Sequence, residues 1–370
     1  MKILFVCGSV EPGKDGVGDY TRRLAGELIR RGHSCSIVAI ADQGVNVVLE
    51  EMQEIELTRI AVLRLPYRKG YQLNCLEAKT WIETFNPEWI SLQYVPFSFH
   101  SKGLPYSLGT AIRKLAKERK LHLMFHELWI GMESNATFKH KCIGLLQQRI
   151  LSNFFSKNEV RVINTQTDLY KSKLATLGYN SQLLPLFSNI IKNKESEGTT
   201  TTDVLELKFC LFGNIHYGSP VEKFINELKH VLSELKDKRV LKFIFIGHCG
   251  AAIEEWKKVL LANKIKFEIS GFVTDKEISI LLSSCQYGIS TTPYVLSQKS
   301  GSLTAMVNHQ IPVLCVARNW TVKGYNQKPF LNVINYENPE TIVNFLDEKF
   351  IISNNTKIEF IVNNFLNGLR

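Results

Sequence analysis

Short apolar runs alternate with amphipathic stretches of helical length along almost the whole chain. In the first half, the runs KILFVCG, SCSIVAI, WISLQYV and LHLMF alternate with amphipathic stretches at 19–31, 108–119 and 139–155. Continuous runs of Val, Ile, Leu and Phe are typical of parallel strands that are buried on both faces. This alternation of strands and helices predicts a doubly wound parallel sheet.

A polar, Thr-rich segment at 189–203 interrupts the pattern and predicts a linker, because it has neither helical nor strand periodicity. The alternation then resumes with LKFCLFG, LKFIFIG and PVLCVA and with helical stretches at 221–235, 252–263, 275–284 and 302–309. We therefore predict an N-terminal domain at 1–188 and a C-terminal domain at 204–350. A last helical stretch at 356–366 carries apolar residues on one face, which must pack on another part of the protein.

The composition is that of a globular protein. Of the 370 residues, 45% are apolar and 22% are charged, which excludes a mainly disordered chain. No apolar stretch approaches the ~20 residues of a membrane-spanning helix, and the start MKILFVCGSVEPG predicts a first strand rather than a signal peptide. Eight cysteines without a CxxC pair predict reduced, buried thiols. We expect a soluble, cytoplasmic protein.

The net charge of +10 is concentrated in the first half. Residues 1–190 hold 24 Lys and Arg against 17 Asp and Glu, whereas the remainder holds 21 against 18. A basic first half favours an anionic partner, and we expect peripheral contact with the inner face of an anionic membrane. A solvated basic surface without a partner is the alternative. Nucleic acid is disfavoured, because the charge is diffuse and no motif interleaves aromatic and basic residues.

Ligands of open α/β sheets bind beyond the carboxyl ends of the strands, so the residues that follow each strand are the candidates. The first is a glycine-rich loop that contains Gly16 and Gly18 and continues into Asp19 and a helix. Its backbone N–H groups could approach an anion. A dinucleotide site with Asp42 on the ribose is a rival, but Thr21 stands where the third glycine of that fingerprint belongs. A plain structural turn is the other alternative.

A second candidate pair, His126 and Glu127, directly follows the run LHLMF. A histidine and an acid at a strand end could act on a substrate hydroxyl or orient a ligand. No second histidine follows four residues later, so the zinc-protease motif is absent. A histidine with a purely structural role is the alternative.

Three loops in the second half, at 212–218, 247–250 and 291–302, complete the candidates, and the last of them predicts a diphosphate site. Lys299 directly precedes a Ser-Gly-Ser turn that would cap a helix, so a cation, hydroxyl groups and a helix N-terminus converge there. The order GxxxxGK[ST] is missing, which argues against ATP hydrolysis. An ordinary capped helix with an exposed lysine is the alternative. The predicted ligand-binding residues of this half are Gly213, Asn214, His216, Gly247, Tyr294, Ser300, Gly301, Ser302 and Thr304.

Three segments together resemble GT-B-fold glycosyltransferases, especially those of family 4. They are GVGDYTRRLAGELIRRGHSCSIV, LFGNIHYGSPVEKFINEL, and GFVTDKEISILLSSCQYGIST followed by SGSLTAMVNHQIPVLC. The resemblance spans nearly the whole chain and lies in the order and spacing of elements. It implies two Rossmann-like domains facing across a cleft, with the acceptor in the first and a nucleotide-diphosphate sugar in the second. It also implies that the segment 351–370 packs back on the first domain.

The donor loop departs from the family pattern. Two glutamates eight positions apart are usual there, whereas aligned positions in this chain are Leu296 and Thr304, or Ser297 and Ala305 in the alternative register. Neither register supplies an acid. Lys299 could supply a positive charge that the family usually carries nearer the second-domain opening.

The resemblance implies transfer of a sugar to a hydroxyl acceptor, retaining rather than inverting, in cell-surface polysaccharide or glycoconjugate synthesis. Lys299 with residues 300–302 would stabilise the departing diphosphate, while Asp19, His126 and Glu127 would surround the acceptor hydroxyl. The chain contains no Asp-x-Asp, and the resemblance implies no metal and no cofactor besides the sugar nucleotide as co-substrate. A GT-B sugar-nucleotide epimerase and a catalytically silent sugar- or lipid-binding module are the alternatives.

Overall fold

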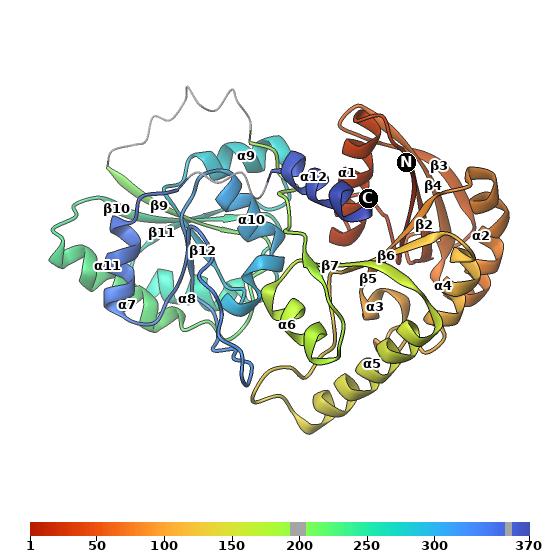
Figure 1. The fold of residues 1–370 in the computed structure, drawn as a ribbon. Coiled ribbons are helices and arrows are strands. Elements are labelled where there is room, and N and C mark those ends of the chain that lie inside the picture. The colour runs from red at the N-terminus through yellow and green to blue at the C-terminus, as the bar shows by residue number, and fades with distance from the viewer. Residues whose placement is uncertain (193–204, 352–356) are drawn as a thin grey trace. The chain divides into compact units, whose positions relative to one another are not determined.

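The computed structural model describes residues 1–192, 205–351 and 357–370, so most of the predicted linker and the predicted helix start at Thr356 lie outside the described residues. The chain divides into two compact units (Figure 1). The N-terminal unit comprises Met1–Pro185, Val322–Tyr325 and Ile358–Arg370, and the C-terminal unit comprises Leu186–Thr321 and Asn326–Lys357.

An eight-stranded sheet forms the centre of the N-terminal unit, in the order β3-β4-β2-β1-β5-β6-β7-β8. All its neighbouring strands are parallel except β3, which is antiparallel to β4. The strands are β1 (Lys2–Cys7), β2 (Ser34–Asp42), β3 (Leu49–Ile55), β4 (Thr58–Pro66), β5 (Trp89–Tyr94), β6 (Lys120–Phe125), β7 (Val160–Thr165) and β8 (Gln182–Leu183).

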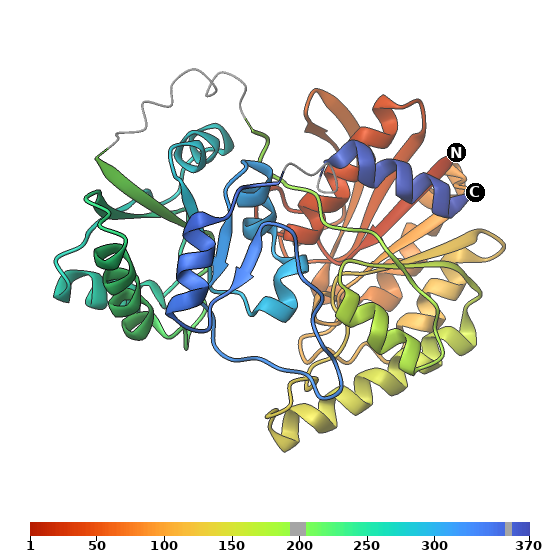
Figure 2. The same ribbon diagram turned by 60° about the vertical axis from the view of Figure 1, so that its left-hand side comes forward.

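Helices cover both faces of this sheet. The ring of Phe365 in α12 stacks against Phe5 and meets His122 edge-on, whereas Phe125, on the opposite face of β6, contacts Phe155 in α5. Helix α12 therefore lies beside α1 on one face, as both views show (Figures 1 and 2). The helices of this unit are α1 (Gly16–Arg30), α2 (Tyr71–Phe85), α3 (Pro96–Phe99), α4 (Leu108–Ala116), α5 (Phe138–Lys157), α6 (Asp168–Thr176) and α12 (Ile358–Leu369).

The C-terminal unit contains a six-stranded parallel sheet in the order β11-β10-β9-β12-β13-β14. Its strands are β9 (Glu206–Phe212), β10 (Val240–Ile246), β11 (Lys266–Ile269), β12 (Tyr287–Ser290), β13 (Val313–Cys315) and β14 (Val333–Asn335). Its helices are α7 (Val221–Glu234), α8 (Ile253–Ala262), α9 (Asp275–Ser283), α10 (Gly301–Asn308) and α11 (Pro339–Asp347). Separate hydrophobic clusters cover the two faces, one around Phe209, Phe243 and Trp256 and the other around Cys210, Ile244 and Met306.

The order of the parallel strands reverses direction once in each sheet. In the N-terminal unit the reversal lies between β1 and β5, and in the C-terminal unit it lies between β9 and β12. The loops that leave such neighbouring strands diverge to opposite faces and open a crevice at the carboxyl edge. Both predicted site regions, after β1 and after β9 and β12, therefore lie at switch points.

The predicted α/β class with two parallel-sheet domains is confirmed. All eight cysteines are free, and all but Cys142 are buried. Four helices (α2, α3, α6 and α11) and three strands (β3, β8 and β14) were not predicted. Within the part of the chain that the structure describes, no helix combines the length and the apolar character needed to cross a membrane.

Replacing Phe365 by Ala is expected to destabilise the N-terminal unit. The ring is 1% exposed and packs on β1 and β6, so its loss should cost about 3–5 kcal/mol of unfolding free energy. Chemical unfolding, with hydrogen exchange at the amides of β1 and β6, measures this. Phe360→Ala on the same helix, where the ring is half-exposed, is the matched control. Equal effects of both substitutions would contradict the packing role.

Candidate functional site

The loop after β9 lies against the amino end of α10 in the C-terminal unit. Gly213 has a φ of +77°, and a Cβ atom added there would lie 3.2 Å from the Cβ of Ser302. Three residues further on, the backbone N–H of His216 donates to Thr291 Oγ1 over 2.9 Å. Both contacts join the loop after β9 to the chain that leaves β12. The switch point thus brings two predicted loops together.

The amino end of α10 is capped by its own preceding serine. Ser300 Oγ accepts a hydrogen bond from the backbone N–H of Leu303 and lies 3.2 Å from Ser302 Oγ. Thr304 is buried, and its hydroxyl donates to the carbonyl of Ser300 over 2.9 Å. Thr304 therefore holds the turn, whereas Ser300 and Ser302 place two hydroxyl groups at the helix end.

Three cationic or titratable side chains come from the loops that follow β9, β12 and β13 at this edge of the sheet. The pKa of His216 is lowered, first by burial and then by the positive charges of Lys299 and Arg318. Lys299 and Arg318 therefore each lie within electrostatic range of His216. Arg318 follows β13, and Gly218 packs against its side chain. Since the N-terminus of a helix also carries partial positive charge, this spot favours an anion.

The other predicted ligand-binding residues of this unit make their contacts away from the amino end of α10. Gly247 follows β10 with a φ of +81°, and its N–H donates to Ser270 Oγ. The loop that it begins approaches Asn214, because a Cβ on Gly250 would lie 2.5 Å from Asn214 Oδ1. The hydroxyl oxygen of Tyr294 accepts a hydrogen bond from the backbone N–H of Phe330 over 3.2 Å.

The glycine-rich loop of the N-terminal unit has the opposite charge. Asp15 caps α1 and accepts from the N–H of Gly18 over 2.6 Å, while Asp19 accepts from the N–H of Gly13. A Cβ on Gly18 would lie 2.9 Å from the backbone of the loop after β1, so this glycine allows close packing; Gly16 faces open space. Two carboxylates already occupy the helix end. The predicted approach of an anion to these N–H groups is therefore not supported.

Asp42 is unavailable to any nucleotide. Its side chain is 0% exposed and forms an ion pair with Arg64 over 2.8 Å. It also accepts from Ser9 Oγ and from the N–H groups of Val10 and Gly44. These bonds hold its pKa below the usual range despite its burial. The rival dinucleotide site is wrong, because the acid that would grip a ribose fixes the β1 loop instead.

His126 lies at the carboxyl end of β6, as predicted, but both its ring nitrogens are used. Nε2 lies 2.8 Å from Gln93 Oε1, and Nδ1 lies 3.1 Å from Gln166 Nε2. The ring of Tyr20 meets it edge-on. With the amides in these orientations, Nε2 donates and Nδ1 accepts. Glu127 follows directly, and its N–H points to the carbonyl of Tyr94.

The hydrogen bonds of His126 continue into a buried chain across β5, β6 and β7. Gln93 Nε2 donates to Ser91 Oγ over 2.7 Å, and this hydroxyl lies 2.8 Å from His122 Nδ1. His122 Nε2 lies 2.9 Å from Asn164 Oδ1. Every donor has an acceptor when the bonds run in one direction along the chain. The chain fixes the orientation of His126.

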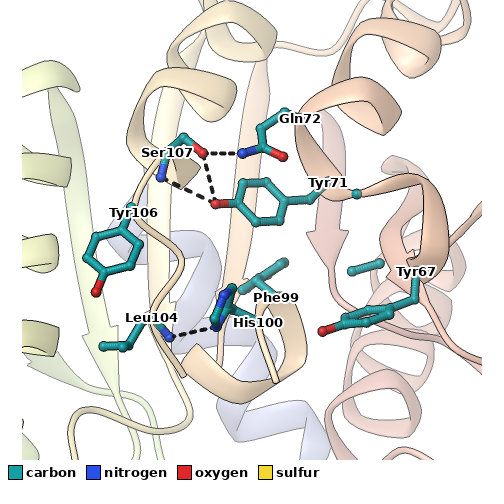
Figure 3. A pocket seen from close by; sticks show the side chains of 10 residues that line it. Tyr67, Tyr71, Gln72, Phe99, His100, Leu104, Tyr106 and Ser107 are labelled. Carbon is teal, nitrogen blue, oxygen red and sulfur yellow. Dashed lines mark hydrogen bonds between the residues drawn. The ribbon is translucent and has the colours of Figure 1, made fainter. Parts of the chain in front are cut away.

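An aromatic pocket of about 290 Å³ opens at the carboxyl edge of the N-terminal sheet (Figure 3). Tyr71 Oη lies 3.0 Å from Ser107 Oγ, and the side chain of His100 is held by the N–H of Leu104. The rings come from the ends of β4, α2 and α3 and from the loop before α4. The lining residues are Ala41, Tyr67, Gly70, Tyr71, Gln72, Phe99, His100, Leu104, Tyr106 and Ser107.

Sequence reasoning missed Arg318, the two glutamines beside His126 and this pocket. Arg318 follows a strand, so the rule that found Lys299 also applied to it. Gln93 and Gln166 gave no signal, because their role depends on the pairing of β5 with β6 and of β6 with β7. Among the described residues, no group of three or more His, Cys, Asp or Glu side chains could hold a metal ion.

No protein-family model and no curated protein matches the sequence. Solved structures do match. Anabaena HepE in complex with UDP and glucose is 16% identical, with 100% of this chain and 99% of that chain covered and a TM-score of 0.58. UDP-GlcNAc 2-epimerase from Methanocaldococcus jannaschii is 12% identical (100% and 99% covered, TM-score 0.55), and trehalose 6-phosphate synthase from Burkholderia multivorans is 10% identical (100% and 98%, 0.55). These likenesses show the GT-B type of fold; membership of family 4 stays a prediction.

The buried His122 is expected to make stability acid-sensitive. Burial lowers its pKa to about 4 from 6.5, so the folded state resists protonation that the unfolded chain accepts. Its contribution is complete above pH 6.5 and is lost as the pH falls toward 4, by about 3 kcal/mol. Unfolding free energies measured across this range should fall less steeply for His122→Gln than for the wild type. His230→Gln, an exposed site, is the control; equal slopes for wild type and His122→Gln would contradict the assignment.

Proposed function

We propose that the protein is a glycosyltransferase that moves a sugar from a nucleotide-diphosphate sugar to a hydroxyl acceptor. The observation that carries this proposal is the approach of the loop after β9 to the amino end of α10, where two serine hydroxyls follow Lys299 and where Lys299 and Arg318 act on His216. A diphosphate brings at least two negative charges and several acceptor oxygens. Helix N–H groups, serine hydroxyls and two permanent cations match that chemistry.

The same groups suit the chemical step. When the bond between the sugar and the diphosphate breaks, negative charge grows on the leaving oxygen. Lys299 and the turn at 300–302 can stabilise that charge before the acceptor attacks, and one well-placed donor contributes roughly 3–4 kcal/mol to such a transition state. This assignment needs neither a metal nor a cofactor besides the sugar nucleotide. We also propose that the transferred sugar retains its anomeric configuration.

The acceptor is assigned to the N-terminal unit. Its aromatic pocket offers ring faces, together with the hydroxyls of Tyr71 and Ser107, for a sugar or a lipid-linked sugar. Asp19 and Glu127 are the carboxylates proposed near the acceptor hydroxyl. His126, with both nitrogens bonded to glutamines, acts as a positioning residue rather than as the base. A cytoplasmic role in polysaccharide or glycoconjugate synthesis belongs to the same proposal.

An epimerase acting on a sugar nucleotide is the second candidate, because one matched structure is a UDP-GlcNAc 2-epimerase. Incubation with a panel of UDP-, GDP-, ADP- and dTDP-sugars, with product analysis, separates the two. Transfer or slow hydrolysis that releases the nucleoside diphosphate supports the transferase. Isomerisation without release supports the epimerase. Binding without turnover would leave a silent binding module.

Substituting Lys299 by Ala is expected to lower turnover about 100-fold, because the departing diphosphate loses one preorganised cation. Arg318→Ala should produce a similar loss. Initial rates of nucleoside diphosphate release measure both, and Lys258→Ala on the exposed side of α8 is the control with the same charge change. Near-normal rates for Lys299→Ala would remove this residue from the mechanism.

Binding of UDP is expected to strengthen as the pH falls through the range in which His216 takes up a proton in the complex. The pKa of free His216 is lowered by burial and by Lys299 and Arg318; a bound diphosphate would offset those charges and raise it, so binding and protonation favour each other. Calorimetric titrations at several pH values measure this. His216→Gln serves as the reference, because the terminal phosphate of UDP ionises equally with both proteins. Identical pH profiles would contradict the placement of the diphosphate.

A further inference from the structure

Helix α5 of the N-terminal unit combines exposed apolar side chains with basic side chains and has no acidic residue. Residues 134–158, which include the whole helix, contain no Asp or Glu. The basic side chains of the helix are Lys139, His140, Lys141, Arg149 and Lys157. The helix lies at the periphery of its unit (Figures 1 and 2).

The outward face of α5 alternates apolar and basic residues. Phe138, Lys141, Leu145 and Arg149 recur at intervals of three or four and therefore share one face. Phe138 is 83% exposed and Leu145 is 64% exposed, with Leu146 beside them at 46%. The inward face, by contrast, is buried against the unit through Gly144, Gln147, Ile150, Leu151 and Phe154.

Positive charge continues past the carboxyl end of the helix. A cavity of about 520 Å³ there is lined by six basic side chains, Arg113, Lys117, Arg119, Lys120, Lys157 and Arg161, against Glu118 and Glu159. Lys117, Lys120 and Arg161 form ion pairs with Glu83, Glu88 and Glu159. Among the described residues, Arg113 and Arg119 form no such ion pair, and Arg119 Nε is buried without a hydrogen-bond acceptor. Guanidinium groups with unused donors are suited to phosphate oxygens.

We propose that the outward face of α5 and this basic cavity form a docking surface for an anionic phospholipid bilayer. The Phe and Leu side chains enter the boundary between headgroups and acyl chains, while Lys and Arg extend to the lipid phosphates. The basic side chains of the cavity bind phosphate groups of the same anionic membrane surface. This inference is independent of the proposed sugar transfer.

Other occupants fit the surface less well. Two copies of α5 would bring together two helices that carry only positive charge, which costs electrostatic energy. A nucleic-acid backbone would pair with the basic residues but would leave Phe138 and Leu145 in water. An anionic bilayer satisfies the apolar and the basic side chains together.

The test compares two double variants of identical chemistry in the full-length protein. Lys141→Glu with Leu145→Ser alters the outward face of α5, and Lys258→Glu with Leu261→Ser alters exposed positions of α8, where Leu261 is 65% exposed. Both change the net charge equally. Co-sedimentation with vesicles of phosphatidylglycerol and phosphatidylcholine, and with pure phosphatidylcholine, gives the partition coefficients.

We expect the wild type and the α8 variant to bind the anionic vesicles equally, and added salt to weaken both. The α5 variant should bind at least about tenfold more weakly, because a cation that attracts the anionic lipids is replaced by an anion that they repel. Equal binding to both vesicle types, or equal losses for both variants, would overturn the proposal. So would a dimer in light scattering that the α5 variant abolishes while vesicle binding persists. Circular dichroism confirms that both variants are folded.

Discussion

The close approach between the loop after β9 and the amino end of α10 is the constraint on which the candidate site depends. Only a glycine fits at position 213, because its φ is positive and a Cβ would press on Ser302. The approach is a consequence of the strand order, since β9 and β12 are neighbours at the reversal of the sheet. The strand order thus fixes the position of the helix end, and Lys299 and Arg318 supply positive charge to this region.

The two units share a topology but have opposite electrostatics at their switch points. In the N-terminal unit, Asp15 caps α1, and its pKa is raised by burial and by the charges of Asp19 and Asp42. In the C-terminal unit, an uncharged Ser300 caps α10 and cations stand around it. The first helix end already has carboxylate partners, whereas the second favours an anion. This difference supports a division of the proposed reaction into an acceptor unit and a diphosphate unit.

The fold was largely predictable, because buried parallel strands have continuous apolar runs, which can be recognised in the sequence without knowledge of tertiary contacts. Strand β3, LEEMQEI, was missed since an exposed edge strand carries mostly polar residues, and α2 was missed since its apolar residues do not define one clear face. The donor-side loops were found by their position after strands. The capping role of Asp15 was also readable, because an acid before a helix is a common N-cap. The hydrogen-bond chain through Gln93 and Gln166 was not, because strand register alone brings those side chains to His126.

The central claim is that a diphosphate binds at α10 and not at α1. Amide chemical shifts of the isotopically labelled, full-length protein, recorded while UDP is added, test it directly. The account predicts that the resonances of Gly213, Gly301 and Ser302 move in proportion to saturation, while those of Gly16 and Gly18 stay in place. Movement of the α1 resonances with unchanged signals at 301 and 302 would contradict it.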